Sequence, residues 1–314
     1  MDNQFKKLLI KKQQLNTHKP LPSELINNLE EWFRVELTYT SNAIEGNTLT
    51  RQETALIVEK GITVQGKSLE EHLEAVNHAK AFDYIKTLAT KNRQELTYQD
   101  ILDIHKIILQ KIDDTNAGRL RTVAVRLKGS ETILPNALKV PELMNDFISW
   151  LKSENTDNPI KIAADTHFKL VSIHPFVDGN GRTARLLMNL LLMQEGFPPA
   201  IIRKEDRSSY IKSLETGQTK NNLTDYYTLI YEAVDRSLDI YLEAAEPEKA
   251  SISEQKMEQR FYTTEEVAKL LQVDPESVRR YVRSGKLRAV KLGGKFIRIE
   301  KNDLNKFIED LKTK

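Results

Sequence analysis

The segment TARLLMNLLLMQEGF, residues 183–197, constrains the fold of this chain more than any other. Its apolar residues surround the whole circumference of an α-helix instead of forming a single stripe. Such a helix is stable in water only when other elements cover it on every side. We therefore expect 183–197 to be the central, buried helix of a helical domain.

Amphipathic helical spacing recurs through most of residues 1–245, so the predicted fold class is mainly α. Ser23 is a predicted N-cap, a further helix is expected from Ser68, and Thr97 forms a predicted capping box with Asp100. The segments with this spacing are 21–44, 68–89, 97–112, 140–154, 160–176, 208–220 and 222–245.

The segment RTVAVRLKGSETILPNA, residues 121–137, interrupts the helices. Val123, Val125 and Leu127 alternate with polar residues, and a second short apolar stretch follows Gly129. This pattern predicts a small β-hairpin with its turn near Gly129. An isolated hairpin is only marginally stable, so a simple surface excursion is the alternative.

The composition is that of a folded protein, and the length indicates more than one domain. The chain has 314 residues, of which 39% are hydrophobic and 29% charged. It contains no cysteine, which excludes disulfides and thiolate metal sites and fits a reducing compartment. We find neither a signal peptide nor a membrane-spanning stretch, and we expect a cytoplasmic protein without membrane contact.

The positive charge is concentrated at the C-terminal end. Residues 260–314 contain 14 Lys and Arg against 8 Asp and Glu, although the whole chain has a net charge of only +2. A nucleic-acid partner is therefore expected there. The polar segment 246–259 lacks periodicity and is predicted to be a linker. The expected regions are an N-terminal helical region (1–94), a helical core (95–245), this linker and a nucleic-acid-binding domain (260–314).

The C-terminal region has the pattern of a winged helix-turn-helix. Thr264 is expected to cap a first helix, and Glu276–Ser284 to form a second that ends at Gly285. Two strands around Gly293 and Gly294 would form the wing. The alternative is a basic surface on a small interaction domain. The candidate DNA-binding residues are Arg279, Arg280, Arg283, Lys286, Arg288 and Lys295.

Two stretches of this region, TTEEVAKLLQV and VRRYVRSGKLRAVKLGGK, carry a family resemblance. Together with the closing helix they are similar to the winged helix-turn-helix domains of excisionase-like and MerR-like proteins. The resemblance implies DNA binding, but it identifies no DNA sequence.

The segment HPFVDGNGRTAR, residues 174–185, has the chemistry of a nucleotide-phosphate site. Glycines before a helix start let the backbone approach an anion, and Arg182 and Arg185 share a helix face. Asp178 would be repelled by a bare phosphate, but it makes sense if it holds Mg²⁺ that bridges phosphates. His174 can take a proton from an incoming hydroxyl. The alternative is a Gly-rich turn between two helices, with the arginines paired to acids elsewhere in the chain.

The same twelve residues match the Fic-domain signature, in which His-Pro-Phe, an acidic residue, Gly-Asn-Gly-Arg and a last arginine are fixed. This resemblance implies a helical Fic core that moves AMP from ATP to a protein hydroxyl. It makes His174 the general base and Asp178 the Mg²⁺ ligand. The residues expected to bind the phosphates of ATP are Gly179, Asn180, Gly181, Arg182 and Arg185.

The resemblance also assigns roles outside this motif. Tyr210 falls where the family often lines the adenine pocket. The predicted hairpin takes the place of a flap that docks the target segment by strand addition. Its candidate docking residues are Lys128, Gly129, Ser130, Glu131, Thr132 and Ile133.

The segment TSNAIEGNTLT, residues 40–50, contains a second motif. Ser41 and Glu45 lie one helical turn apart and Gly46 is expected to end the helix. An acid in the last turn of a helix faces the negative end of the dipole and favours a cation from elsewhere. The segment resembles the Fic inhibitory motif: Ser or Thr, three residues, Glu, then Gly or Asn. This resemblance implies that Glu45 pairs with Arg185 and misplaces ATP.

We therefore expect an autoinhibited adenylyltransferase that uses ATP and Mg²⁺, with a DNA-binding tail. Its partners would be DNA and a protein with a Ser, Thr or Tyr hydroxyl, including the chain itself, and a homo-oligomer is compatible with the sequence. One alternative is a transcription regulator whose Fic fold only senses nucleotide. Another keeps the enzyme but changes the reaction to removal of AMP, or to transfer of UMP, phosphate or phosphocholine.

Overall fold

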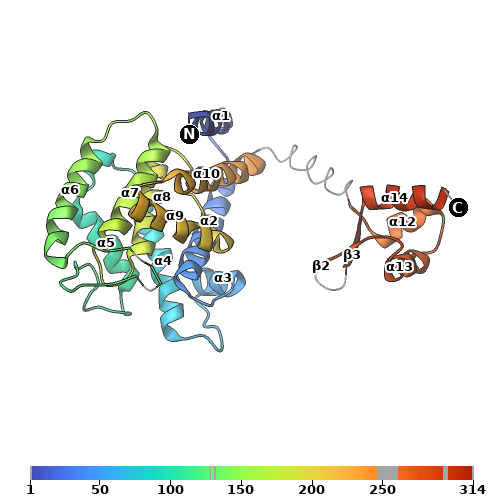
Figure 1. The fold of residues 1–314 in the computed structure, drawn as a ribbon, viewed down its shortest axis with the longest axis horizontal. Coiled ribbons are helices and arrows are strands. Elements are labelled where there is room, and N and C mark those ends of the chain that lie inside the picture. Colours follow the sequence, from blue (N-terminus) through green and yellow to red (C-terminus); the bar gives the residue numbers. More distant parts are fainter. Residues whose placement is uncertain (1, 128, 131, 246–260, 293–295, 313–314) are drawn as a thin grey trace. The chain divides into compact units, whose positions relative to one another are not determined.

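The computed structural model describes residues 2–127, 129–130, 132–245, 261–292 and 296–312 (Figure 1). The chain divides into two compact units, residues 1–245 and 246–314, and each is considered by itself. The predicted linker, 246–259, lies outside the described residues. Within the described ranges, the helices are too short or too polar to cross a membrane.

The first unit is helical, as the sequence predicts, and α8 (Asn180–Gln194) runs through its core (Figure 1). Residues Leu186–Leu192 of α8 are all buried, and α2, α4, α5 and α7 pack around the helix. The other helices of this unit are α1 (Asp2–Thr17), α2 (Ser23–Glu45), α3 (Arg51–Lys60), α4 (Leu69–Leu88), α5 (Tyr98–Leu109), α6 (Val140–Ser153), α7 (Pro159–Ile173), α9 (Arg207–Lys220) and α10 (Thr224–Ala245).

The helix ends follow local sequence signals with one error. Ser68 and Thr97 form capping boxes at the starts of α4 and α5, the latter with Asp100 as predicted. The prediction for Ser23 is wrong by one residue, because the extended Pro22 precedes the helix and Ser23 is already helical. Gly46 ends α2 in the left-handed conformation, with φ +110°.

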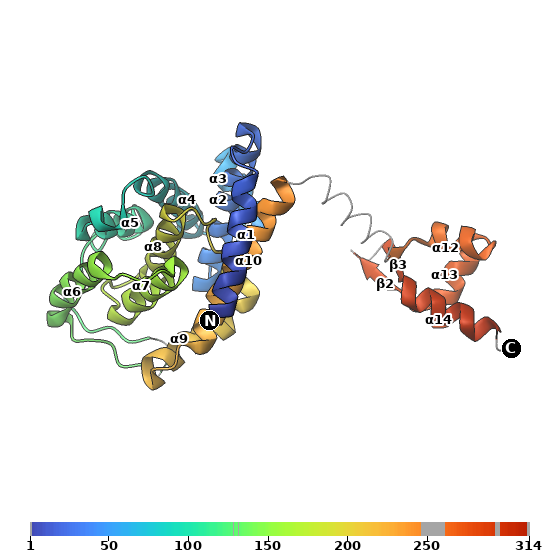
Figure 2. The same ribbon diagram turned by 90° about the horizontal axis from the view of Figure 1, so that it is seen from above.

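The N-terminal helix closes one side of this unit by pairing with the last one. Figure 2 shows α1 lying alongside α10, and the two helices are in contact. Lys7 and Lys11 on α1 form ion pairs with Asp235 and Asp239 on α10. The buried Leu8 and Leu15 join α1 to the main hydrophobic core. The first and last helices of the unit thus pack against each other and share its main hydrophobic core.

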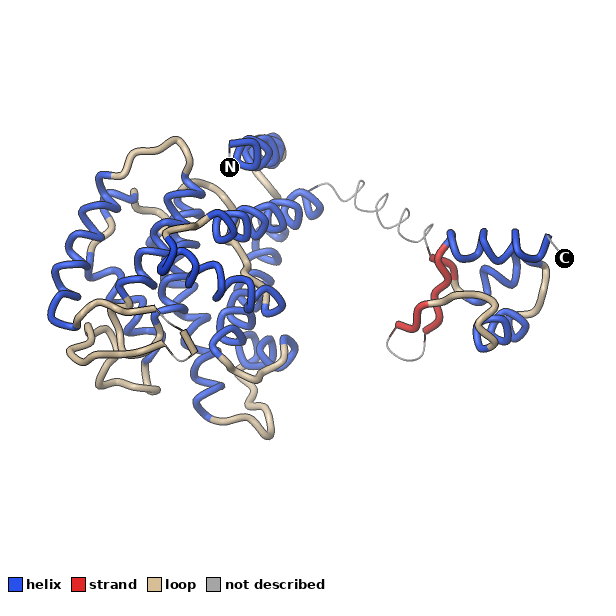
Figure 3. The backbone as a smooth tube through the Cα atoms, viewed as in Figure 1, coloured by secondary structure: helices blue, strands red, loops and turns tan. Residues whose placement is uncertain are grey.

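The predicted β-hairpin is wrong as a secondary structure. The described residues of 122–136 form a turn at Gly129, with φ +77°, but no strand (Figure 3). Two short strands cannot pair stably without a third or a covering element. Here the Arg121 side chain instead bridges the two ends of the loop by donating to the carbonyls of Val123 and Pro135. Lys128 and Glu131 lie outside the described residues.

The second unit contains all strands in the described ranges (Figure 3). Helices α12 and α13 form the helix-turn-helix, and β2 and β3 form the antiparallel wing. The predicted cap is wrong by one residue: Thr263 caps α12 through a capping box with Glu266, whereas Thr264 is helical and buried. The elements are β1 (Phe261–Tyr262), α12 (Thr264–Leu271), α13 (Pro275–Arg283), β2 (Val290–Leu292), β3 (Phe296–Glu300) and α14 (Lys301–Lys312).

Candidate active site

The loop between α7 and α8 presents the twelve-residue motif. His174 ends α7 in the left-handed conformation, with φ +51°, so the chain turns sharply at this residue. Phe176 is fully buried and anchors the loop. Asn180 closes a small ring with Phe176, accepting from its N–H at 3.0 Å and donating to its carbonyl at 2.9 Å. These contacts hold the start of α8, whose first N–H groups have no partner within the helix.

His105 supports this loop from α5. Its ring stacks on Phe176 with centroids 3.6 Å apart. One ring nitrogen accepts from the Gly118 N–H, so the other carries the proton and donates to the Asp178 carbonyl at 2.9 Å. Gly179 leaves room for this histidine, since a Cβ there would come within 3.2 Å of the ring. Burial lowers the pKa of His105 to about 4, so the ring is neutral.

Arg185 reaches from α8 to the end of α2. Its guanidinium donates to the Glu45 carboxylate at 2.6 Å, and to the hydroxyl and carbonyl of Ser41, both at 2.9 Å. A Cβ at Gly181 would overlap the Glu45 carboxylate, so only glycine permits this arrangement. Burial acts to lower the pKa of Arg185, but the charges and hydrogen bonds of Glu45 and Tyr210 together exceed this effect and raise the pKa. The cation is therefore held firmly at the C-terminus of α2.

A buried chain of hydrogen bonds leads from Tyr226 through His167 and Tyr210 to Arg185. The Tyr226 hydroxyl donates to the Ala164 carbonyl and lies 2.9 Å from Nδ1 of His167. The Nε2 atom of His167 lies 2.7 Å from the Tyr210 hydroxyl. Tyr226 must then accept from His167, which in turn accepts from Tyr210. The lone pairs of Tyr210 remain for Arg185, 3.5 Å away. Tyr210 therefore supports an arginine here, and both nitrogens of His167 are occupied.

Arg182 faces a different partner set. It is buried and donates to Glu74 on α4 at 2.7 Å and to Asp178 at 2.9 Å. Asn47, which follows the end of α2, donates to the other oxygen of Glu74 at 2.8 Å. Burial raises the pKa of Glu74, and the charge of Arg182 opposes this rise. The two arginines of the motif are thus each paired with an acid from the N-terminal region.

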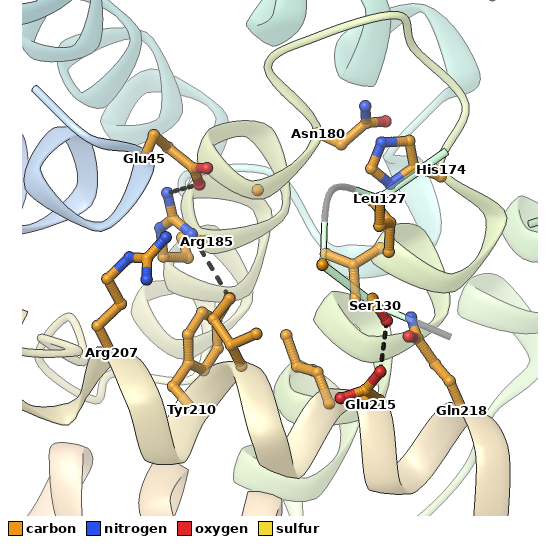
Figure 4. Close-up of a pocket in the computed structure, with 15 residues that line it drawn as sticks. Glu45, Leu127, Ser130, His174, Asn180, Arg185, Arg207, Tyr210, Glu215 and Gln218 are labelled. Carbon is orange, nitrogen blue, oxygen red and sulfur yellow. Dashed lines mark hydrogen bonds and ion pairs between the residues drawn. The ribbon is translucent and has the colours of Figure 1, made fainter. Parts of the chain in front are cut away.

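A cavity of about 280 Å³ opens beside the start of α8 (Figure 4). It brings together eight predicted site residues: His174, Asn180, Gly181, Arg185, Tyr210, the inhibitory Glu45, and Gly129 and Ser130 of the predicted flap. Figure 4 shows Glu45 and His174 on opposite sides of this cavity. Asp178, Gly179 and Arg182 lie outside its lining. The further lining residues are Leu127, Val171, Arg207, Ile211, Leu214, Glu215 and Gln218.

His174 is suited to accept a proton. Burial lowers its pKa, and the charge of Arg121 acts in the same direction. A backbone hydrogen bond to Val171 and the carboxylates of Glu45 and Asp178 oppose this shift. The result is an imidazole that is neutral near pH 7 and faces a cavity, which is the state a general base requires.

Asp178 could hold a metal ion only if a bound nucleotide supplied further oxygen ligands to that ion. Its side chain is 67% exposed beside the loop and pairs with Arg182. In the described part of the chain, no three His, Asp or Glu side chains cluster as a metal site. Mg²⁺ commonly binds one or two carboxylates together with substrate phosphates and water, so a single exposed carboxylate suits Mg²⁺ carried by a nucleotide.

Sequence reasoning missed three residues that complete the site: Glu74, Arg121 and Arg207. Arg207 on α9 lines the cavity and donates to the Ile44 carbonyl at 2.6 Å, which places a second cation at the end of α2. The loop of residues 122–136 is called the flap below. Its turn is held by the Ser130 hydroxyl, which donates to Glu215 at 2.6 Å (Figure 4). Glu74, Arg121 and Arg207 each have a partner far away in the sequence, and no local motif marks them.

The candidate DNA-binding residues are divided by their contacts. Arg279 pairs with Glu265 and Glu276, and Arg283 also pairs with Glu276. Arg280, Lys286 and Arg288 are exposed. Lys295 lies outside the described residues.

The buried histidines predict acid sensitivity of the first unit. Burial lowers the pKa of His78 and of His167 to about 3, and that of His105 to about 4. In the unfolded chain these groups take up protons below about pH 6.5, whereas the folded state excludes them. The free energy of unfolding should therefore fall as the pH drops below 6.5, by up to about 1.4 kcal/mol per pH unit for each histidine. Urea unfolding between pH 7.5 and 5 measures this, and a flat profile would contradict it.

Comparisons with known proteins give the same two families as the sequence motifs. Residues 95–192 match the model of the Fic/DOC family, and residues 261–312 match that of a helix-turn-helix domain. The protein adenylyltransferase Fic of Nematostella vectensis is 40% identical over 206 residues, which cover 65% of this chain and 48% of the relative. That of Aedes aegypti is 40% identical over 219 residues, with coverages of 69% and 43%. The chain thus spans less than half the length of these curated relatives.

Solved structures extend the similarity to most of the first unit. A segment of Fic-1 from C. elegans is 33% identical with a TM-score of 0.72, and the match covers 79% of this chain and 73% of that one. A Fic domain-containing signaling protein from Bacteroides thetaiotaomicron is 29% identical with a TM-score of 0.68, with coverages of 78% and 98%. The chain belongs to the Fic/DOC family and ends in a helix-turn-helix domain, as its motifs predict.

Proposed function

We propose that this chain is a protein adenylyltransferase, which moves AMP from ATP to a hydroxyl group of a target protein. The observation that carries the proposal is the single cavity that His174, Gly181 and Arg185 line together. A neutral base, the start of a helix and a buried cation are the groups that attack on a nucleotide phosphate requires. The adenylyltransferases among the relatives support the same reaction.

The proposed reaction uses His174 first. It removes the proton of the target hydroxyl, whose oxygen forms a bond to the α-phosphorus of ATP. The bond from this phosphorus to the oxygen of the β-phosphate breaks, pyrophosphate leaves with that electron pair, and the proton stays on His174. The start of α8 and Arg185 would bind the phosphate oxygens. Asp178 would hold Mg²⁺, which when bound offsets phosphate charge.

We further propose that Glu45 inhibits this reaction. Its carboxylate lies against Gly181 and occupies Arg185, the side chain that would otherwise contact the outer phosphates of ATP. A nucleotide could then enter the cavity only with its α-phosphate displaced from the hydroxyl. Small displacements of this kind cost large factors in rate, because much of the catalytic effect comes from near-attack geometry.

The flap is the proposed docking site of the target. Its turn lines the cavity beside His174, and Ile133 is 94% exposed. An extended target segment could pair with the flap at the exposed Ile133 and bring its hydroxyl to the histidine.

Mass spectrometry of a cell lysate treated with the Glu45→Gly protein and ATP tests the proposed function. We expect peptides that carry one adenylyl group on Ser, Thr or Tyr. A different transferred group, or the loss of adenylyl groups already present, would instead favour one of the other Fic reactions. Peptides unchanged by the treatment would leave a nucleotide sensor as the better account.

We propose that the second unit binds DNA. Its helix α13 carries the exposed Arg280, and the exposed Lys286 and Arg288 lie in the segment between α13 and β2. A helix of this kind enters a major groove, while basic residues of the wing contact phosphates.

Substitution of Arg280 and Lys286 together by alanine should weaken DNA binding by about 10-fold or more and reduce its salt dependence, because two cationic contacts are lost. Gel shifts on genomic fragments at two salt concentrations measure both effects. The exposed Lys306 on α14 provides the control substitution, Lys306→Ala. Equal losses from both substitutions would contradict the assignment of this surface.

A further inference from the structure

Arg121 is a buried cation between the flap and the catalytic loop. It is only 2% exposed, although an arginine is rarely buried without strong partners. Its guanidinium donates to the carbonyl of His174 at 2.7 Å, that of Val123 at 3.1 Å and that of Pro135 at 2.6 Å. The backbone N–H of Arg121 donates to the Pro175 carbonyl at 2.9 Å. All these contacts go to main-chain atoms.

The three carbonyls belong to segments that the reaction must bring together. Val123 and Pro135 are the two ends of the flap, and His174 is the candidate base. The guanidinium has a rigid planar fork, so it fixes the distances between these carbonyls as a flexible ammonium cannot. In a loop without strands, this side chain takes the place of a hydrogen-bonded ladder.

We propose that Arg121 is a positioning residue that joins the flap and the His174 loop into one unit, so that a docked target hydroxyl meets the base in register. This proposal rests on the proposed transfer reaction. Arg121 does not contact the reacting atoms. It acts by holding His174 in its left-handed turn and by fixing the width of the flap.

The charge of Arg121 gives the proposal a second measurable consequence, a change in the pKa of His174. The groups that act on the His174 ring are Arg121, which lowers its pKa, and Glu45 and Asp178, which raise it. In the Glu45→Gly protein, Arg121 and Asp178 remain. Replacing Arg121 with the neutral methionine should therefore raise the pKa of His174, whereas lysine keeps the charge and loses the fork.

The test compares Arg121→Lys and Arg121→Met in the Glu45→Gly background, with Arg119→Met as the matched control, since Arg119 is exposed two residues away. We expect both Arg121 variants to lose about 10-fold or more in kcat/KM for the target protein, as geometric misplacement predicts. The acidic limb of the pH–rate profile should move to higher pH for methionine and stay in place for lysine. Imidazole titration by NMR follows His174 in the same proteins without relying on turnover.

The outcomes separate this proposal from the proposed function. If the Glu45→Gly parent transfers nothing, the transfer reaction fails, and the titration still tests the position of Arg121 beside His174. If the parent is active and both Arg121 variants match it in kcat/KM and in titration, the positioning role is overturned. A loss of thermal stability alone, with kinetics and titration unchanged, would also overturn it, because Arg121 would then be only structural.

Discussion

Replacement of Glu45 with glycine should raise the initial rate of AMP transfer about 100-fold over the unmodified protein. The change removes the carboxylate that pairs with Arg185 at 2.6 Å and lies against Gly181. Arg185 keeps Ser41 and Tyr210 as partners, so the arginine stays near its position while its charge becomes available to phosphate. Transfer from labelled ATP to the chain or to a target measures the rate.

Glu31→Gly is the matched control for this prediction. Glu31 is exposed in the interior of the same helix, α2, where glycine weakens the helix at least as much as it does at the last position, Glu45. The control should leave the rate at its basal level, because it does not touch the cavity. An equal increase in both variants would mean that loosening α2 is enough, and an unchanged rate with Glu45→Gly would refute the brake.

The His174→Ala substitution in the Glu45→Gly background should reduce transfer by about 10³-fold, since it removes the general base. The backbone contacts of residue 174 with Arg121 do not depend on its side chain, so the fold of the loop is expected to persist. Unchanged binding of ATP, measured by calorimetry, would separate loss of chemistry from loss of the site.

His18→Ala is the control for this second prediction, because His18 lies in the segment between α1 and α2, outside the cavity lining. It should leave transfer at the level of the Glu45→Gly parent. Transfer that survives the loss of His174 would show that another group accepts the proton.

The sequence carries much of the first unit in its local patterns. The apolar run before Gln194 predicts a buried α8, and the pairing of Thr97 with Asp100 predicts a capping box. These features depend on residues within a few positions of one another. The predicted caps at Ser23 and Thr264 are each wrong by one residue, because neighbouring residues compete for one cap position.

The contacts that define the site arise from distant parts of the chain. Glu74 meets Arg182 across 108 positions and Arg207 meets Ile44 across 163, so no local pattern could reveal either pair. The pairing of Glu45 with Arg185 could be expected only through the family motif. The flap shows the opposite failure: alternation at Val123 and Leu127 predicts strands, but no neighbouring strand covers them in the described residues.

The most direct test of the central claim uses ATP labelled on either its α- or its γ-phosphate. The Glu45→Gly protein and the Glu45→Gly/His174→Ala protein are each incubated with both forms, and the label retained on protein is measured. The account predicts that protein acquires the α-label from the first variant only, and acquires no γ-label. Protein that acquires the γ-label, or an α-label that does not depend on His174, would contradict it.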